Sequence, residues 1–167
     1  MTRPERKIRS LVGIVVCGLL VIAFGRASAE PPQLQIHSRE GDSKDAVQLS
    51  PGEIALKPVE GKPGVYSANL IGNPGAAGVY VVFVKMDNGA TNAPHTHPDG
   101  RATTVVTGKV LYGLGDRIDP SSAKVYGPGS FYYTPPNTPH YLVATEGEVL
   151  YQEVGMGPSA SIPVQSK

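Results

Sequence analysis

Short apolar segments separated by glycine and proline fill the chain from residue 49 to residue 157. Segment 79–86 (VYVVFVKM) is apolar on both faces as far as Lys85, which is typical of a central strand covered on both sides. Segment 65–71 alternates apolar and polar positions before a turn, which predicts a half-buried strand. No window of a dozen residues in this part of the chain has the apolar spacing of an amphipathic helix. The pattern therefore predicts an all-β sandwich or barrel.

The same criteria predict strands along the rest of this region. They are expected at 53–59, around the histidines near 95–97, and at 103–107, 110–114, 124–126, 130–134, 140–144 and 148–154. Gly108-Lys109 provides a hairpin turn between the two strands that flank it. The polar segment 30–48 predicts an N-terminal arm with at most one short strand, at 34–37, and residues 158–167 predict a flexible C-terminal tail. We therefore expect one β-barrel domain at residues 49–157.

The first 29 residues have the three-part order of a secretory signal peptide. A basic head precedes an apolar run of 15 residues at 11–25, and Ala27-Ser28-Ala29 offers a small-residue cleavage site. The run is shorter than the roughly 20 apolar residues that span a bilayer, which argues against the alternative of an uncleaved anchor. Cleavage after Ala29 predicts a periplasmic or secreted protein with no membrane attachment.

Cleavage would also change the charge and remove the only cysteine. The whole chain has a formal net charge of +1, and the first 29 residues carry five basic residues and one acidic residue, so the remainder has −3. No basic patch remains, which argues against nucleic acid as a partner. Cys17 lies in the apolar run, so the mature chain would have no disulfide and no thiolate to act as nucleophile or metal ligand.

Three histidines have positions that suggest one metal site. His95 and His97 are two residues apart, so their side chains point to the same face of an extended strand. His140 opens a later predicted strand after the rigid corner 135–137, which can direct one imidazole inward. Neutral imidazole is the commonest metal ligand. We therefore predict that His95, His97 and His140 bind a metal, the alternative being three polar core residues, while His37 in the arm is expected to be solvated.

The histidines stand in two blocks that together resemble the motifs of the cupin superfamily. The first cupin motif is G-x5-H-x-H-x3,4-E-x6-G, matched at 89–108, and the second is G-x5-P-x-G-x2-H-x3-N, matched at 129–144. Every spacing agrees, but Arg101, Asn137 and Ala144 replace the motif glutamate, glycine and asparagine. The resemblance implies a cupin-type β-barrel (a double-stranded β-helix or jelly roll) with a metal at the barrel mouth, and a family in which homodimers are frequent.

The resemblance also indicates which metal to expect. Arginine cannot replace the missing glutamate as a ligand, because its guanidinium is always charged and has no lone pair to give. An all-histidine site suits transition metals better than magnesium or calcium. By similarity to three-histidine cupin dioxygenases we expect iron, with nickel, copper, zinc or manganese as alternatives. Three facial ligands leave up to three positions on an octahedral ion for substrate or oxygen.

Two further residues are candidates for catalysis. Arg101 either clamps the anionic group of a substrate beside the metal, or turns away and pairs with Asp99 or another acid at the barrel rim. Tyr132 and Tyr133 are neighbours on a strand, so one faces inward, and Tyr133 is our candidate donor to a bound ligand, a core aromatic being the alternative. For Glu153 we favour a side chain that points outward over one that points inward.

Two classes of function are consistent with these features. The first is an exported, metal-dependent oxidoreductase of the dioxygenase type that acts on a small anionic or enolisable compound, with a metal-dependent lyase or isomerase as a variant. The second is a module that binds a small ligand or a metal without turnover. The missing glutamate slightly favours the second class, since a carboxylate often supplies the proton-transfer step. Both classes predict a small molecule as the partner.

Overall fold

The computed structural model describes residues 46–165 of the chain. The predicted signal peptide and the strand expected at 34–37 lie outside the described residues. Within 46–165 there are strands and one short 3₁₀ helix, and no α-helix. No helix in that range is long and apolar enough to cross a membrane. The prediction of an all-β fold is confirmed for this part of the chain.

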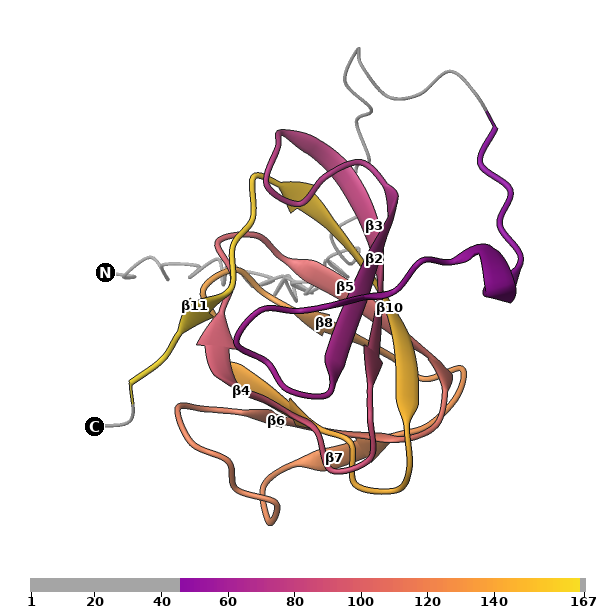
Figure 1. The fold of residues 1–167 in the computed structure, drawn as a ribbon. Coiled ribbons are helices and arrows are strands. Elements are labelled where there is room, and N and C mark those ends of the chain that lie inside the picture. Colours follow the sequence, from indigo (N-terminus) through magenta and orange to yellow (C-terminus); the bar gives the residue numbers. More distant parts are fainter. Residues whose placement is uncertain (1–45, 166–167) are drawn as a thin grey trace, which may run out of the picture. The chain divides into compact units, whose positions relative to one another are not determined.

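The strands form two antiparallel sheets (Figure 1). One sheet has the order β1-β2-β3-β10-β5-β8, and the other has the order β11-β4-β9-β6-β7. The strands are β1 (Lys57–Pro58), β2 (Val65–Ile71), β3 (Gly78–Met86), β4 (Thr91–Thr96), β5 (Arg101–Thr107), β6 (Val110–Leu114), β7 (Lys124–Tyr126), β8 (Phe131–Thr134), β9 (His140–Val143), β10 (Val149–Gly157) and β11 (Ile162–Pro163). Neighbours in a sheet are often far apart in sequence, as β3 and β10 are.

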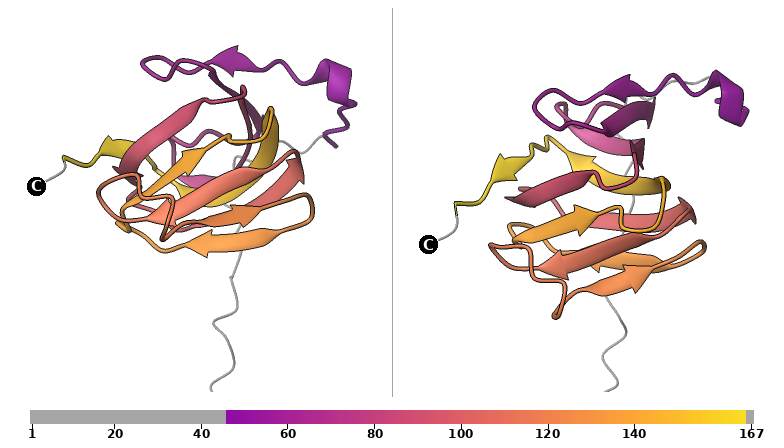
Figure 2. Two further views of the ribbon diagram at one scale, coloured as in Figure 1. Left: turned by 90° about the horizontal axis from the view of Figure 1, so that it is seen from below. Right: turned by 60° about the horizontal axis from the view of Figure 1, so that its bottom comes forward.

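The hydrophobic core lies between the two sheets, which face each other as layers (Figure 2). Strand β3 is central, as predicted, and every second side chain from Tyr80 to Met86 is buried. From the opposite sheet, Val110 and Leu142 reach the same core cluster. Burying one such aliphatic side chain stabilises the fold by about 1.5–3 kcal/mol. The packed layers therefore give a rigid frame for polar residues at one end of the barrel.

The predicted strand at 53–59 is mostly absent. Residues Pro51–Glu53 instead form a 3₁₀ helix, and β1 has only two residues. Proline at the first helical position has a backbone angle suited to a helix, and the Glu53 carboxylate accepts a hydrogen bond of 2.7 Å from the Ser50 amide. Pro58 has no N–H to donate, which limits the pairing of β1 with β2.

Part of the predicted C-terminal tail is paired with the barrel. Strand β11 lies along β4, with Ile162 opposite Thr96. The Ser159 amide donates to the carbonyl of Pro74 over 2.6 Å, and the Val164 amide donates to the carbonyl of Pro94 over 3.0 Å. The segment is ordered because its backbone groups find partners, and β11 also covers the edge of β4.

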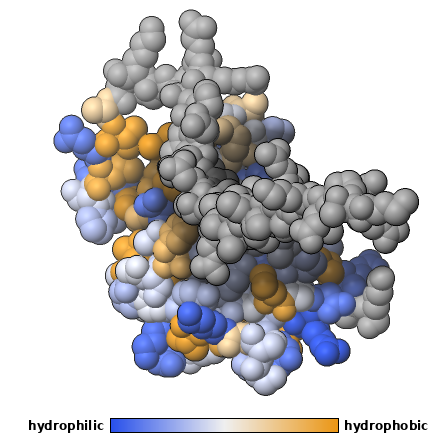
Figure 3. Space-filling model, turned by 180° about the vertical axis from the view of Figure 1, so that it is seen from behind, coloured by the Kyte–Doolittle hydropathy of each residue, from blue (hydrophilic) through white to orange (hydrophobic). Residues whose placement is uncertain are grey.

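Some large hydrophobic side chains remain on the surface. Phe131 and Tyr133, both on β8, are 61% and 50% exposed. On the face shown in Figure 3, hydrophobic side chains are interspersed with hydrophilic ones. Scattered exposed apolar residues are normal for a folded domain. The homodimer implied by the family resemblance stays a prediction.

Candidate metal centre

The structure brings the three predicted histidines together. His95 lies on β4 directly opposite His140 on the antiparallel neighbour β9, and His97 follows one residue after β4 ends. All three are buried, with exposed fractions of 3% for His95, 4% for His97 and 3% for His140. One nitrogen from each ring lies within 4.8 Å of the others. Three buried histidines in this arrangement could hold a metal ion.

Every one of these imidazoles has its Nδ1 at hydrogen-bonding distance from a backbone carbonyl oxygen. The acceptors are the carbonyls of Ala93 for His95 (2.7 Å), Ala160 for His97 (2.7 Å) and Thr138 for His140 (2.9 Å). A carbonyl can only accept, so Nδ1 carries the proton and Nε2 keeps its lone pair. Hydrogen bonds of this kind orient metal-binding histidines in proteins. The tautomer of all three rings therefore suits coordination through Nε2.

The electrostatics of the cluster keep the rings neutral. The ring centroids of His95 and His140 are 4.3 Å apart, and those of His95 and His97 are 4.7 Å apart. Burial lowers the pKa of His95 to about 3, helped by the neighbouring His140. Burial also lowers the pKa of His97 to about 3, helped by the charge of Arg101. Neutral imidazoles have a free lone pair at pH 7, so the residues present fit a divalent transition metal.

The corner before β9 also positions the site. Asn137 has a φ of 57° in the left-handed region, and its amide donates to the carbonyl of His97 over 2.7 Å. Asparagine tolerates this conformation better than most residues, which explains how it stands where the cupin motif has glycine. The corner is thereby tied to His97 while it delivers His140 to the cluster.

Arg101 is held by acidic partners. Its Nη1 donates to Glu153 Oε2 over 2.7 Å, its Nη2 donates to Ser159 Oγ over 2.9 Å, and its Nε lies 3.9 Å from Asp99 Oδ1. Burial, the largest single influence, lowers the pKa of Arg101, but the contributions of Glu153, Tyr80 and Asp99 together outweigh it and the net shift is upward. Of the two arrangements considered from the sequence, the structure has the ion-paired one.

Glu153 supplies the inward carboxylate that the first motif lacks. It is only 7% exposed and lies on β10, next to β5 in the sheet. This differs from the outward orientation favoured from the sequence, because the Arg101 guanidinium offers a buried partner for the charge. An arginine and a glutamate on neighbouring strands thus take the place of the single motif glutamate.

The ion pair belongs to a wider network that reaches the C-terminal segment. The Tyr80 hydroxyl donates to Asp99 over 2.5 Å, and the Ser159 hydroxyl donates to the same carboxylate. Ser159 precedes Ala160, whose carbonyl accepts the hydrogen bond from His97. The network therefore fixes the backbone that orients one of the three histidines.

Of the two adjacent tyrosines, Tyr132 faces inward and Tyr133 does not. Tyr133 is half exposed and covers Gly100, where a Cβ atom would lie 2.1 Å from its hydroxyl. Tyr132 is buried and stacks on Tyr112 with ring centroids 4.3 Å apart, and its hydroxyl has no partner. The Tyr112 ring lies 5.8 Å from that of His140. The structure does not bring the candidate Tyr133 to the histidines, but it brings an aromatic pair beside them.

Sequence analysis missed Asn92. Asn92 and His95 are three residues apart on β4, so strict alternation would put them on opposite faces. A β-bulge shifts the register between them, and both side chains are buried. Pro94 lies inside the bulge and cannot donate to the ladder, which is the feature that could have revealed the irregularity.

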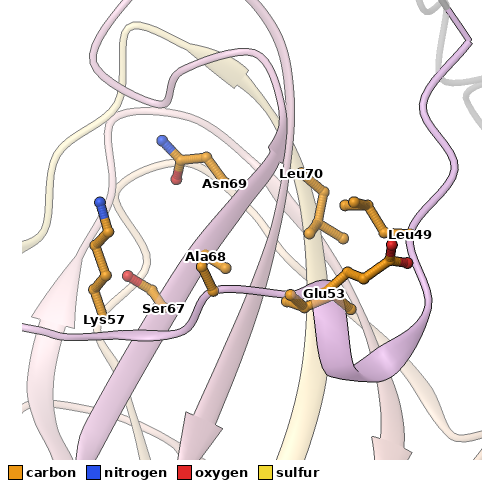
Figure 4. Close-up of a pocket in the computed structure, with 9 residues that line it drawn as sticks. Leu49, Glu53, Lys57, Ser67, Ala68, Asn69 and Leu70 are labelled. Carbon is orange, nitrogen blue, oxygen red and sulfur yellow. The ribbon is translucent and has the colours of Figure 1, made fainter.

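A hollow elsewhere on the molecule is separate from the histidines. It has a volume of about 440 Å³ and lies between the segment around Glu53 and strand β2 (Figure 4). Its walls come from Leu49, Glu53, Ile54, Ala55, Lys57, Ser67, Ala68, Asn69 and Leu70. None of the three histidines lines it. Among residues 46–165, His95, His97 and His140 form the one group of side chains that could hold a metal ion.

Comparison with known proteins matches part of the chain to one family. Residues 82–151 match the family model described as a cupin domain. A curated relative, germin-like protein subfamily T member 3 from Arabidopsis thaliana, is 36% identical over 77 residues. That match covers 44% of this chain and 34% of the relative, so the chain spans about a third of that protein.

Solved structures share the fold of the described residues. The polyketide cyclase RemF from Streptomyces resistomycificus has a TM-score of 0.62 at 18% identity, covering 72% of this chain and 86% of that one. KdgF from Halomonas sp. has a TM-score of 0.53 at 26% identity, covering 64% and 89%. An RmlC-like cupin from Shewanella frigidimarina has a TM-score of 0.53 at 21% identity, covering 70% and 95%. These similarities support a cupin jelly roll.

Proposed function

Because this chain belongs to the cupin superfamily, we propose that its three histidines hold one divalent transition metal and that the protein is a metal-dependent enzyme of the dioxygenase type. One observation carries the proposal. Each of the three buried histidines has one ring nitrogen within 4.8 Å of the others, while each Nδ1 is at hydrogen-bonding distance from a backbone carbonyl oxygen. We propose iron as the metal, in keeping with an all-nitrogen donor set.

The residues of the site have separate roles. His95, His97 and His140 hold the ion, which when bound supplies Lewis-acid and redox chemistry to oxygen-containing ligands. The buried hydroxyl of Tyr132 has no partner, so it is free to donate a hydrogen bond to a ligand. Burial raises the pKa of this hydroxyl, which is protonated at pH 7. Arg101 is bound to Glu153 in a buried ion pair, so we assign it a structural role rather than that of a substrate clamp.

The lining of the site favours a particular class of substrate. Tyr112 and Tyr132 present an aromatic surface beside His140, and Arg101 is already paired with carboxylates. A small enolisable or phenolic compound, bound through oxygen and packed on these rings, fits such surroundings. A strongly anionic compound fits less well.

A second candidate function is ligand binding without turnover. Glu153 and Asp99, the carboxylates beside Arg101, both lie in its network. Neither is therefore free to act as a general base in this arrangement. A protein that captures a metal or a small ligand needs no such base, and a lyase or isomerase does.

We also propose that the protein is exported. The basic head, the apolar run and the small-residue site at Ala27–Ala29 support this proposal. Sequencing the N-terminus of protein recovered from the cell envelope or medium tests it, with Glu30 expected as the first residue. A chain that keeps Met1 and stays with the cytoplasmic fraction would contradict export.

The enzymatic proposal is tested in two steps. Metal content is measured on protein purified without a metal-affinity tag, and about one ion per chain is expected. Oxygen uptake is then followed with the iron-loaded protein and a panel of small phenols and diketones, with His140→Ala as the matched inactive control. Stoichiometric metal without oxygen uptake on any compound would favour the binding module instead.

A further inference from the structure

The buried amide of Asn92 lies at the edge of the histidine cluster. Its side chain is on the inner face of β4 because the bulge between Asn92 and His95 resets the alternation of the strand. The residue is 8% exposed. A buried amide normally has its hydrogen-bonding groups paired. The Oδ1 atom of Asn92, however, has no partner.

The other end of the amide contacts the lone pair that a metal would use. Nδ2 of Asn92 lies 3.5 Å from Nε2 of His95. Since Nδ1 of His95 donates to the Ala93 carbonyl, Nε2 is the acceptor and Nδ2 is the donor in this contact. An ion bound to Nε2 would take that lone pair and would face the positive end of the amide. The amide cannot keep this orientation beside a cation.

Half a turn about the Cβ–Cγ bond resolves the conflict. The turn exchanges Nδ2 and Oδ1 with almost no change in the volume that the side chain fills. It breaks the contact with His95 Nε2 that the ion already replaces, and Oδ1 has no hydrogen bond to lose. An amide oxygen is a suitable ligand for a divalent cation.

The separation of the two atoms agrees with shared coordination. Ligand bonds of about 2.0–2.1 Å put neighbouring ligand atoms about 3.3 Å apart in a tetrahedral shell and about 2.9 Å apart in an octahedral one. The amide atom now 3.5 Å from His95 Nε2 is close to these values. We propose that Asn92 is the fourth protein ligand of the metal, through Oδ1.

This inference rests on metal binding by the three histidines, and its test separates the two. Cobalt(II) is titrated into the purified protein, and both the dissociation constant and the visible d–d absorption are recorded. Asn92→Ala is expected to weaken cobalt binding about 10- to 100-fold, the range found when a group that supports a metal site is removed, and to change the intensity of the bands. Asn92→Asp, which adds a charged oxygen in the same place, is expected to bind cobalt at least as tightly as the wild type.

Asn88 offers a matched control, because it is an exposed asparagine whose Oδ1 accepts a hydrogen bond from Gly147. Asn88→Ala is expected to leave both the affinity and the spectrum unchanged. A measurement on the wild type guards against a variant that does not fold. Zinc should shift the side-chain amide resonances of Asn92 in a nitrogen-15 NMR spectrum and leave those of Asn88 in place.

The outcomes are distinct. If the wild type binds no cobalt or zinc, the proposed metal site itself is wrong. If it binds cobalt but Asn92→Ala keeps the affinity within threefold and the same spectrum, or if zinc leaves the Asn92 amide signals unmoved, then Asn92 is a packing residue and this inference is overturned.

Discussion

At the scale of single residues, the site depends on hydrogen bonds that hold rings and charges in fixed orientations. Nδ1 of His95 and Nδ1 of His140 each donate a hydrogen bond to the carbonyl two residues earlier in the chain, whereas Nδ1 of His97 donates to the carbonyl of the distant Ala160. Local hydrogen bonds make two of the three rings nearly independent of the rest of the fold. The orientation of the third ring, that of His97, depends on the C-terminal segment that contains Ala160.

Removal of one histidine should nearly abolish metal binding. We expect His140→Ala to lower the bound metal from about one ion per chain to a small fraction, because two imidazoles alone form a weak site. Metal content after dialysis against a weak chelator measures the effect. Tyr133→Phe is the control and should keep its metal, since Tyr133 lies away from the cluster. Full retention of metal by His140→Ala would show that His140 is not a ligand.

The buried ion pair gives a second prediction at this scale. Glu153→Gln should lower the free energy of unfolding by about 3 kcal/mol, because it removes the closest countercharge of the buried Arg101 guanidinium and leaves only Asp99, 3.9 Å from Nε. Denaturant unfolding measures the change. The double variant Arg101→Met, Glu153→Leu should recover part of the loss, since a hydrophobic pair of similar volume removes the unpaired guanidinium, while Asp99 keeps its hydrogen bonds from Tyr80 and Ser159. A loss below about 1 kcal/mol in the single variant would show that the pair is solvated.

At the scale of elements, two irregular segments complete the site. The bulge in β4 turns Asn92 inward, and the segment that leads into β11 brings the Ala160 carbonyl to His97. The regular strands form the frame of the barrel, whereas the bulge and the segment before β11 orient the side chains of Asn92 and His97. Both irregular segments lie next to each other, since β11 pairs with β4.

Shortening the chain should therefore weaken the metal site without removing any ligand. A variant that ends at Pro158 loses the Ala160 carbonyl and Ser159, so His97 is free to rotate, and we expect zinc affinity to fall about 10- to 100-fold. Competition with a coloured chelator measures the affinity. A variant that ends at Gln165 is the control and should bind zinc like the full chain. Equal affinities in both would mean that the C-terminal segment does not orient His97.

Most of the regular strands were predictable from the sequence, and the irregular segments were not. The hairpin predicted at Gly108-Lys109 is wrong, because the two strands that flank it, β5 and β6, lie in different sheets. Segments 79–86 and 110–114 are apolar and bounded by turn residues, so periodicity alone located them. The pairing of residues 162–163 depends on backbone hydrogen bonds to β4, which leave no mark on hydropathy. Family spacing placed the three histidines, but the partner of Arg101 required knowing that β10 lies beside β5.

At the scale of the whole molecule, the buried histidines link stability to pH. Folding holds the pKa of His95 and of His97 at about 3, below the ordinary value of 6.5. Between pH 3 and pH 6.5 these two histidines bind protons in the unfolded chain but not in the folded, metal-free chain. The stability contribution is therefore complete above pH 6.5 and is lost as the pH falls towards 3, by about 1.4 kcal/mol per pH unit for each histidine.

The metal-free protein should accordingly melt at much lower temperature at pH 4.5 than at pH 7.5. Differential scanning calorimetry after chelation and dialysis measures the shift. Replacing His97 by glutamine, which does not titrate, should make the slope shallower between pH 6.5 and 4.5. A melting temperature that stays constant across this interval would mean that the histidines accept protons in the folded state.

The pairing of Arg101 with Glu153 also restricts how this sequence can change over time. A single substitution of Arg101 by glutamate would restore the family motif, but it would set a third carboxylate beside those of Glu153 and Asp99 and remove the cation that now separates them. Neutralisation of Glu153 must come first for that step to be tolerated. The two positions therefore evolve as a pair with a preferred order of mutation, so the departure at Arg101 is hard to reverse.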